Sequence, residues 1–229
     1  MTSAIRVDAR RSVPHKYGMN VHSQNRPTPR RGRPRLDDKR RRILDAALRE
    51  FATRGYHGTA VPEVAAGAQV GTGTLYRYFA TKEVLVNEVY RDAKARLRAA
   101  LIDGVDLATV DEAWFLDAWR RLTVFARAEP AAFQFLEMQD HAPYLDDASR
   151  EVELGVLTPL WMAGLRLHEG IPSPRPLSVD VRMAMVWGAF VGLIKAERLG
   201  YLTLDDATLM RAGEQAWRLI APTEAGRAP

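Results

Sequence analysis

The chain has 229 residues and no cysteine. Disulfide bridges, zinc–thiolate sites and cysteine nucleophiles are therefore excluded. No apolar run approaches the roughly 20 residues that a membrane span needs, and no apolar segment of the secretory kind stands near the N-terminus. We therefore expect a cytoplasmic protein that does not enter the membrane.

Sequence motifs of enzyme active sites are also missing. The chain has no G-x-S-x-G nucleophile elbow, no glycine-rich phosphate loop and no Glu-x-x-His pair of the di-iron type. Glu137, Asp140 and His141 stand close together, but Pro143 follows them and no fourth ligand is evident, so we predict no metal site. Our interpretation is a protein that is not an enzyme and uses no cofactor. A helical-bundle enzyme is the alternative.

Charge is distributed unevenly along the chain. Residues 1–42 hold 13 Lys/Arg against 3 Asp/Glu, although the formal net charge of the whole chain is only +5. The remainder is therefore acidic on balance. Basic charge of this density favours contact with nucleic acid, through an attraction that depends on salt and not on base sequence. A solvated tail without function is the alternative.

No segment alternates apolar and polar residues as a half-buried strand does, so we predict an all-α fold. Residues 1–35, which lack apolar periodicity, are predicted to be a disordered basic arm. Asp37 or Asp38 is expected to cap the first long helix, and the later caps are Thr81, Ser178 and a capping box formed by Thr203 and Asp206. The long helices are predicted at residues 38–55, 81–104, 110–128, 130–141, 147–168 with a kink at Pro159, 178–200 and 203–221.

Two shorter helices are predicted between residues 59 and 79. Thr59 can cap the first, with Pro62 tolerated in its opening turn, and its apolar face is formed by Val61, Val64, Ala65 and Ala68. A turn at residues 67–71 leads to the second helix, which buries Leu75 and Phe79. Two short helices joined by a tight turn are typical of a helix-turn-helix, whose second helix presents its N-terminal residues to the DNA major groove.

The outer face of the second short helix carries side chains that suit DNA. Hydroxyl groups and a guanidinium hydrogen-bond phosphate oxygens, and Thr and Arg also reach base edges. We expect base contacts from Thr72, Thr74 and Arg77. Phosphate contacts are expected from Thr59, Tyr76, Tyr78 and Lys82, and Gly73 is also among the predicted DNA-binding residues. An ordinary helical hairpin with a solvated polar face is the alternative.

These residues resemble the DNA-binding signature of the TetR family of transcriptional regulators. The resemblance rests on the run GTLYRYFATKEVL, preceded by TAVPEVAAGAQV, and extends back through residues 43–47 and 51–56. It implies a fold of about nine helices with an N-terminal three-helix helix-turn-helix DNA-binding domain, here residues 36–97. A C-terminal helical ligand-binding and dimerisation domain would follow at 98–222, with a tail at 223–229. The family usually has glycine where this chain has Gln69, so we expect a turn with a strained or altered geometry.

The basic arm adds a second DNA-binding element. Arg31-Gly32-Arg33-Pro34-Arg35 resembles the Arg-Gly-Arg-Pro core of an AT-hook, which lies in the minor groove of A·T-rich DNA. We therefore expect Arg31, Arg33 and Arg35 to strengthen binding beside the helix-turn-helix.

The last two helices supply candidates for a dimer interface. The resemblance implies that they pair with those of a second subunit, which would allow two helix-turn-helix units to read paired half-sites. Gly188 and Gly192 stand four residues apart and permit close helix approach. The predicted interface is Trp187, Gly188, Val191, Gly192, Gly213 and Trp217. Packing within one chain is the alternative.

The region between residues 110 and 190 is rich in large apolar side chains with a few polar ones among them. Such a mixture can line a largely apolar cavity with polar anchors, and the resemblance implies a cavity whose small-molecule ligand alters the spacing of the DNA-binding heads. The predicted lining is Trp114, Trp119, Phe133, Glu137, Met138, His141, Trp161 and His168. For each aromatic residue, ordinary core packing is the alternative.

The sequence predicts a DNA-binding regulator, and the resemblance implies that it is a homodimeric repressor released from a palindromic operator by a small apolar ligand. An architectural DNA-binding protein without a ligand is the alternative, and a ligand-dependent change in DNA affinity would separate the two.

Overall fold

The computed structural model describes residues 36–167 and 177–221, and in these ranges every regular element is a helix. The predicted arm, the tail and His168 lie outside them. No helix of the described ranges has the length and apolar composition of a membrane span. The helices are α1 (Leu36–Gly58), α2 (Val61–Gly67), α3 (Thr72–Tyr78), α4 (Lys82–Leu101), α5 (Glu112–Ala128), α6 (Pro130–Glu137), α7 (Asp147–Arg166), α8 (Val179–Arg198) and α9 (Asp206–Ile220).

Several helix starts follow the predicted caps. The hydroxyl oxygens of Thr81 and Ser178 accept hydrogen bonds from the backbone N–H groups of Val84 and Val181, which satisfies donors that lack intrahelical partners. The Thr203–Asp206 capping box is wrong, because Asp205 caps α9 through Thr208 N–H at 2.7 Å.

Other predicted boundaries need correction. The first helix begins at Leu36, so neither Asp37 nor Asp38 caps it, and it extends to Gly58 through a break at Gly55, where φ is 68°. The sixth ends at Glu137 and not at residue 141. The seventh continues through Pro159 to Arg166.

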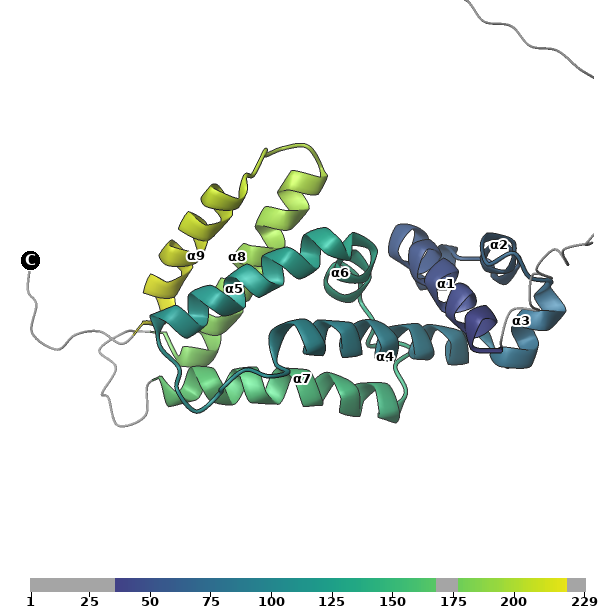
Figure 1. The fold of residues 1–229 in the computed structure, drawn as a ribbon, viewed down its shortest axis with the longest axis horizontal. Coiled ribbons are helices and arrows are strands. Elements are labelled where there is room, and N and C mark those ends of the chain that lie inside the picture. Colours follow the sequence, from purple (N-terminus) through teal and green to yellow (C-terminus); the bar gives the residue numbers. More distant parts are fainter. Residues whose placement is uncertain (1–35, 168–176, 222–229) are drawn as a thin grey trace, which may run out of the picture. The chain divides into compact units, whose positions relative to one another are not determined.

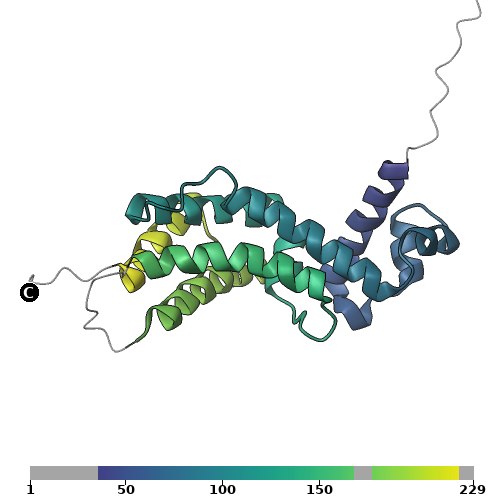
Figure 2. The ribbon, with the colours of Figure 1, turned by 90° about the horizontal axis from the view of Figure 1, so that it is seen from below.

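A continuous core joins the helix-turn-helix to the C-terminal helices. Figures 1 and 2 both show α4, which follows α3, lying along α7. The Phe51 ring of α1 stacks on Phe135 of α6, with ring centres 6.2 Å apart. At the other end, α5 packs on α9, and the Trp119 indole N–H donates to the Leu209 carbonyl at 2.8 Å. In the described residues, α4 and α6 therefore contact both α1 and the C-terminal helices, so that the two regions share one core.

Candidate DNA-reading surface and ligand cavity

The turn between α2 and α3 has the geometry that a helix-turn-helix requires. Val61, Val64, Ala65 and Ala68 are buried, so α2 packs through the predicted small apolar face. Gln69 has φ of 57° and is the one non-glycine residue of the described ranges in the left-handed region. The turn therefore keeps the conformation for which glycine is suited, at an energetic cost to the glutamine.

The α3 helix divides its residues between the core and solvent. Leu75 and Phe79 are each 1% exposed and anchor the helix. The opposite side offers the predicted reading residues: Gly73, Tyr76 and Arg77 are exposed, and Thr72, Thr74 and Tyr78 are half-buried. Every residue of α3 other than Leu75 is therefore at least partly exposed, on a short helix that follows a tight turn.

Two predicted phosphate-binding residues have other surroundings. Thr59 does not cap α2, because Ala60 holds the N-cap position. Its side chain is buried and its hydroxyl donates to the Gly55 carbonyl at 2.8 Å, so the hydroxyl does not reach the surface. The Lys82 ammonium lies 4.6 Å from the centre of the Tyr56 ring, and partial burial lowers its pKa.

The basic residues of α1 have structural roles that the charge pattern did not reveal. Arg40 pairs with Glu88 of α4 and lies over the Phe79 ring at 5.6 Å. Arg41 reaches Asp92 of α4 at 2.6 Å. These two ion pairs connect α1 to α4. Part of the N-terminal positive charge is therefore neutralised within the protein. Arg31, Arg33 and Arg35 lie outside the described residues.

A cavity of about 490 Å³ lies among α4, α5, α6, α7 and α8, with one residue of α9 in its wall. Its volume falls in the range of roughly 300–1,000 Å³ typical of sites for drug-sized ligands. Four of the predicted lining residues are part of its wall: Trp114, Trp119, Glu137 and Trp161. Trp187, which was assigned to the dimer interface, lines it as well.

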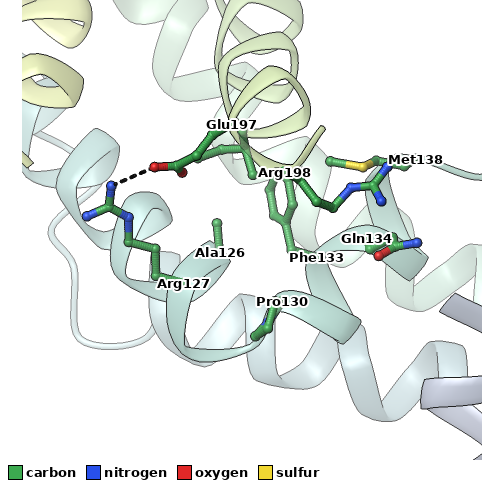
Figure 3. A pocket seen from close by; sticks show the side chains of 9 residues that line it. Ala126, Arg127, Pro130, Phe133, Gln134, Met138, Glu197 and Arg198 are labelled. Atoms are coloured by element: carbon green, nitrogen blue, oxygen red, sulfur yellow. Dashed lines mark hydrogen bonds and ion pairs between the residues drawn. The ribbon is translucent and has the colours of Figure 1, made fainter. Parts of the chain in front are cut away.

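Three other predicted residues lie elsewhere. Phe133 and Met138 border a smaller recess of about 180 Å³, near the ion pair between Arg127 and Glu197 (Figure 3). His141 is buried, with its ring nitrogens 2.6 Å from the Tyr144 hydroxyl and 2.6 Å from the Phe135 carbonyl. The prediction assumed a sixth helix that reached residue 141, and this helix ends at Glu137.

Among the described residues of the cavity wall, three have ionisable side chains and the others are uncharged. The Lys94 ammonium lies 3.7 Å from Oε1 of Glu137, and Glu153 completes the set. Burial raises the pKa of Glu137, against the opposing effects of Lys94 and of a hydrogen bond from Trp187. Burial also raises the pKa of Tyr90, whose hydroxyl hydrogen-bonds Glu153.

Lys94 and Glu153 were missed by the sequence reasoning. A signal for Lys94 was present, because it follows Tyr90 by four residues and precedes Leu97 by three, on the apolar side of α4. A lysine at such a position is rare without a partner. No comparable signal marked Glu153.

Two unpartnered polar atoms accompany this cavity. Oε1 of Glu137 and Nε1 of Trp114 are buried, and neither has a hydrogen-bond partner among the residues that the structure describes. Buried polar atoms without partners are uncommon and require an explanation. A bound molecule that supplies a donor and an acceptor would satisfy both.

The predicted dimer residues separate into two groups. Gly213 packs against the Trp119 ring and Trp217 against Phe115, with ring centres 5.4 Å apart, so both belong to the core of one chain. Gly188 and Gly192 are exposed, and a Cβ atom added at either would meet no atom within 4 Å. Val191 is half-buried beside them.

Helix α6 contacts both the cavity and the helix-turn-helix. Leu136 and Glu137 line the cavity. Gln134 donates to the Ala52 carbonyl of α1 at 2.6 Å, and Phe135 stacks on Phe51. A change in the cavity therefore has a direct physical route to α1.

Both halves of the chain resemble known regulators. Residues 43–89 match the profile of bacterial regulatory proteins of the tetR family, and residues 96–221 match that of the Tetracyclin repressor-like C-terminal domain. A stretch of 71 residues is 38% identical to the HTH-type transcriptional repressor KstR2 of Mycobacterium tuberculosis. It makes up 31% of this chain and 36% of that protein, so the chain spans about a third of this relative's length.

Solved structures extend the likeness across most of the fold. A TetR family transcription regulator from Marinobacter aquaeolei VT8 has a TM-score of 0.70 at 20% identity, over 82% of this chain and 97% of that one. AibR, in complex with isovaleryl coenzyme A and operator DNA, has a TM-score of 0.63 at 18% identity, over 81% of this chain and 100% of that one. With a helix-turn-helix, a matching C-terminal domain and profile matches over both halves, the chain belongs to the TetR family of bacterial transcriptional regulators.

Proposed function

We propose that this regulator is a repressor, which binds a palindromic operator as a homodimer and leaves it when a small molecule occupies the cavity. The observation that carries the proposal is α6, which places Glu137 in the cavity wall and Gln134 on the Ala52 carbonyl of α1. The repressor function of KstR2 and the operator-bound and ligand-bound state of AibR support it.

DNA reading is assigned to the exposed face of α3. Arg77 can contact a guanine edge in the major groove, and Thr72 and Thr74 stand one turn earlier. Tyr76 and Tyr78 would hydrogen-bond phosphates with their hydroxyl groups. Lys82, held on Tyr56, would add a cation at the start of α4. The Arg31, Arg33 and Arg35 arm would add minor-groove contacts that raise affinity without choosing the site.

The dimer is assigned to α8 and not to the buried face of α9. Val181, Met185, Gly188 and Gly192 follow one another at intervals of three or four residues, and all are exposed. This spacing places them on one side of the helix. An exposed apolar face with two glycines would allow a second α8 to approach closely.

Ligand control is assigned to displacement of α6. A molecule that enters the cavity would press on Leu136 and Glu137. Gln134 of α6 and Gln139, just after it, would transmit the movement to the α1 carbonyls that they bond. A shift of α1 would change the separation of the two reading heads and weaken the operator complex.

The test of DNA reading begins with selection of an operator from random duplexes. Arg77→Ala should then relax preference at one base position, whereas Tyr76→Phe should weaken binding to all sequences alike. Arg120→Ala, which removes an exposed charge from α5, is the control and should leave operator affinity unchanged. An Arg77→Ala protein with wild-type site preference would refute the assignment of α3.

Deletion of residues 1–35 should reduce the slope of log affinity against log salt concentration by about 0.9 per lost phosphate contact.

The test of the dimer is sedimentation. Gly192→Glu should yield monomers that retain helical content, because a carboxylate buried in an interface without a partner costs several kcal/mol (~3–5). Ala207→Glu places the same charge on the exposed side of α9 and should leave the dimer intact. A dimer that survives the first change and is lost with the second would place the interface on α9.

A further inference from the structure

The cavity wall carries more negative than positive charge. Glu137 and Glu153 contribute two carboxyl groups, and Lys94 contributes one ammonium. The other described residues of the wall are uncharged. Because the surroundings are apolar, a charge in this space is weakly screened and its partners matter more than at the surface.

The ammonium of Lys94 is already committed to neighbours. It lies 3.7 Å from Glu137 Oε1 and 5.5 Å from the centre of the Tyr90 ring, on a side chain that is only 6% exposed. An anionic ligand would have to compete with Glu137 for this ammonium. It would also face both carboxylates, at a cost that burial increases.

Glu137 has an oxygen that no described residue hydrogen-bonds. Its Oε1 is buried without a hydrogen-bond partner among these residues, although the Lys94 ammonium pairs with it at 3.7 Å and Trp187 hydrogen-bonds the carboxyl group. A carboxylate left in this state is costly unless a donor reaches it. A ligand N–H group would be such a donor, and a positive charge on it would shorten and strengthen the bond.

Aromatic faces complete the environment. Trp114, Trp161 and Trp187 all line the cavity. Indole rings attract cations through their negative faces, most strongly where water is excluded. We propose that the effector is an apolar molecule with a protonated amine, whose ammonium binds at Glu137 and Glu153 while its hydrocarbon part fills the space among the tryptophans. This inference rests on the proposed ligand control, because it names the chemical class of that ligand.

The proposal separates this cavity from that of a coenzyme A thioester, the ligand present in AibR. Phosphate groups bind most strongly to cationic donors such as Arg and Lys, and the one cation among the described residues of this wall is paired with a carboxylate.

Three probes of equal length test the charge preference: 4-phenylbutylamine, 4-phenylbutan-1-ol and 4-phenylbutanoate. Binding to the full-length protein can be followed by tryptophan fluorescence, because four of the five tryptophans line the cavity, and confirmed by calorimetry. We expect the amine to bind about tenfold more tightly than the alcohol or better, and the carboxylate to bind most weakly. Equal affinities, a preference for the carboxylate, or no detectable binding of the amine would overturn the proposal.

Variants locate the effect. Glu137→Gln and Glu153→Gln each remove one carboxylate and should reduce amine affinity about fivefold or more while leaving the alcohol's affinity unchanged. Glu151→Gln is the control, since Glu151 is exposed on α7 and does not line the cavity. If Glu137→Gln perturbs folding, the amine affinity of Glu153→Gln still tests whether a carboxylate of the cavity binds the amine. Amine binding that survives both substitutions would refute the assigned anchors.

The ligand class and the proposed ligand control fail in different ways. Release of operator DNA is measured separately, by the fluorescence anisotropy of a labelled duplex. Tight amine binding without release would contradict ligand control and would support the ligand class. Release by the carboxylate and not by the amine would support ligand control and contradict the ligand class.

Discussion

The close contact between Gly213 and Trp119 can be tested by mutation, and the result distinguishes a core role for this face of α9 from a role in the dimer interface. In Gly213→Ala, the new methyl group would lie 2.8 Å from Cδ1 and 2.9 Å from Cγ of Trp119. The indole cannot easily move away, because its N–H donates to the Leu209 carbonyl and the Phe190 ring packs perpendicular to it, with ring centres 5.0 Å apart. Either the ring or the helix must therefore shift.

The magnitude follows from two opposing effects. Overpacking of a tight core costs about 1–3 kcal/mol, and replacing glycine by alanine inside a helix returns up to about 1 kcal/mol. We expect Gly213→Ala to reduce the free energy of unfolding by about 1–2 kcal/mol, and the melting temperature to fall by about 2–4 °C per kcal/mol for a chain of this size.

Urea unfolding followed by circular dichroism measures this change. Gly155→Ala is the matched control, since its added Cβ would meet only the end of the Arg98 side chain, at an ordinary contact distance of 3.6 Å. The control should gain stability, by up to about 1 kcal/mol. If Gly213→Ala were stabilised as much as Gly155→Ala, the close packing of α9 on α5 would be wrong.

Two further predictions concern the turn and the buried histidine. Gln69→Gly should stabilise the protein by about 0.5 kcal/mol. Removing the cost of the left-handed backbone gains about 1–2 kcal/mol, and this exceeds the cost of a more flexible unfolded chain, about 0.4–1 kcal/mol. A lower urea midpoint than that of the wild type would contradict this. Burial lowers the pKa of His141, so the unfolded chain takes up the proton more readily and stability should fall as the pH drops below about 6.5. His141→Gln should reduce this slope relative to wild type, and an unchanged slope between pH 5 and 7 would show that His141 does not cause it.

The helix-turn-helix could be predicted because its determinants are local. The burial of Val64, Leu75 and Phe79 follows from helical spacing, and the strained turn at Gln69 was expected because the family usually has glycine there. The Thr59 cap failed for a reason that is also local. The break at Gly55 brings its carbonyl to the Thr59 hydroxyl, which then bonds backward and not to the next helix.

The cavity could be predicted as a kind of site but not residue by residue. Composition indicated aromatic walls, yet the direction of each side chain depends on where helices end and how they pack. His141 does not line the cavity, because α6 ends at Glu137. Trp217 packs into the core, because α5 covers that side of α9. Glycine spacing alone could not separate Gly192, which is exposed, from Gly213, which is covered.

The break at Gly55 has a consequence for how the two halves of the protein depend on each other. The last carbonyls of a helix run out of N–H donors of their own and need them from elsewhere. Just before the break, Phe51 and Ala52 receive theirs from Gln139 and Gln134, which belong to the C-terminal half. The first helix of the DNA-binding half is thus capped by side chains of the same protein that are far away in sequence. A fragment that ends after α4 would lose this cap and expose Phe51, so its α1 should fray, and its affinity for DNA would not represent that of the intact regulator.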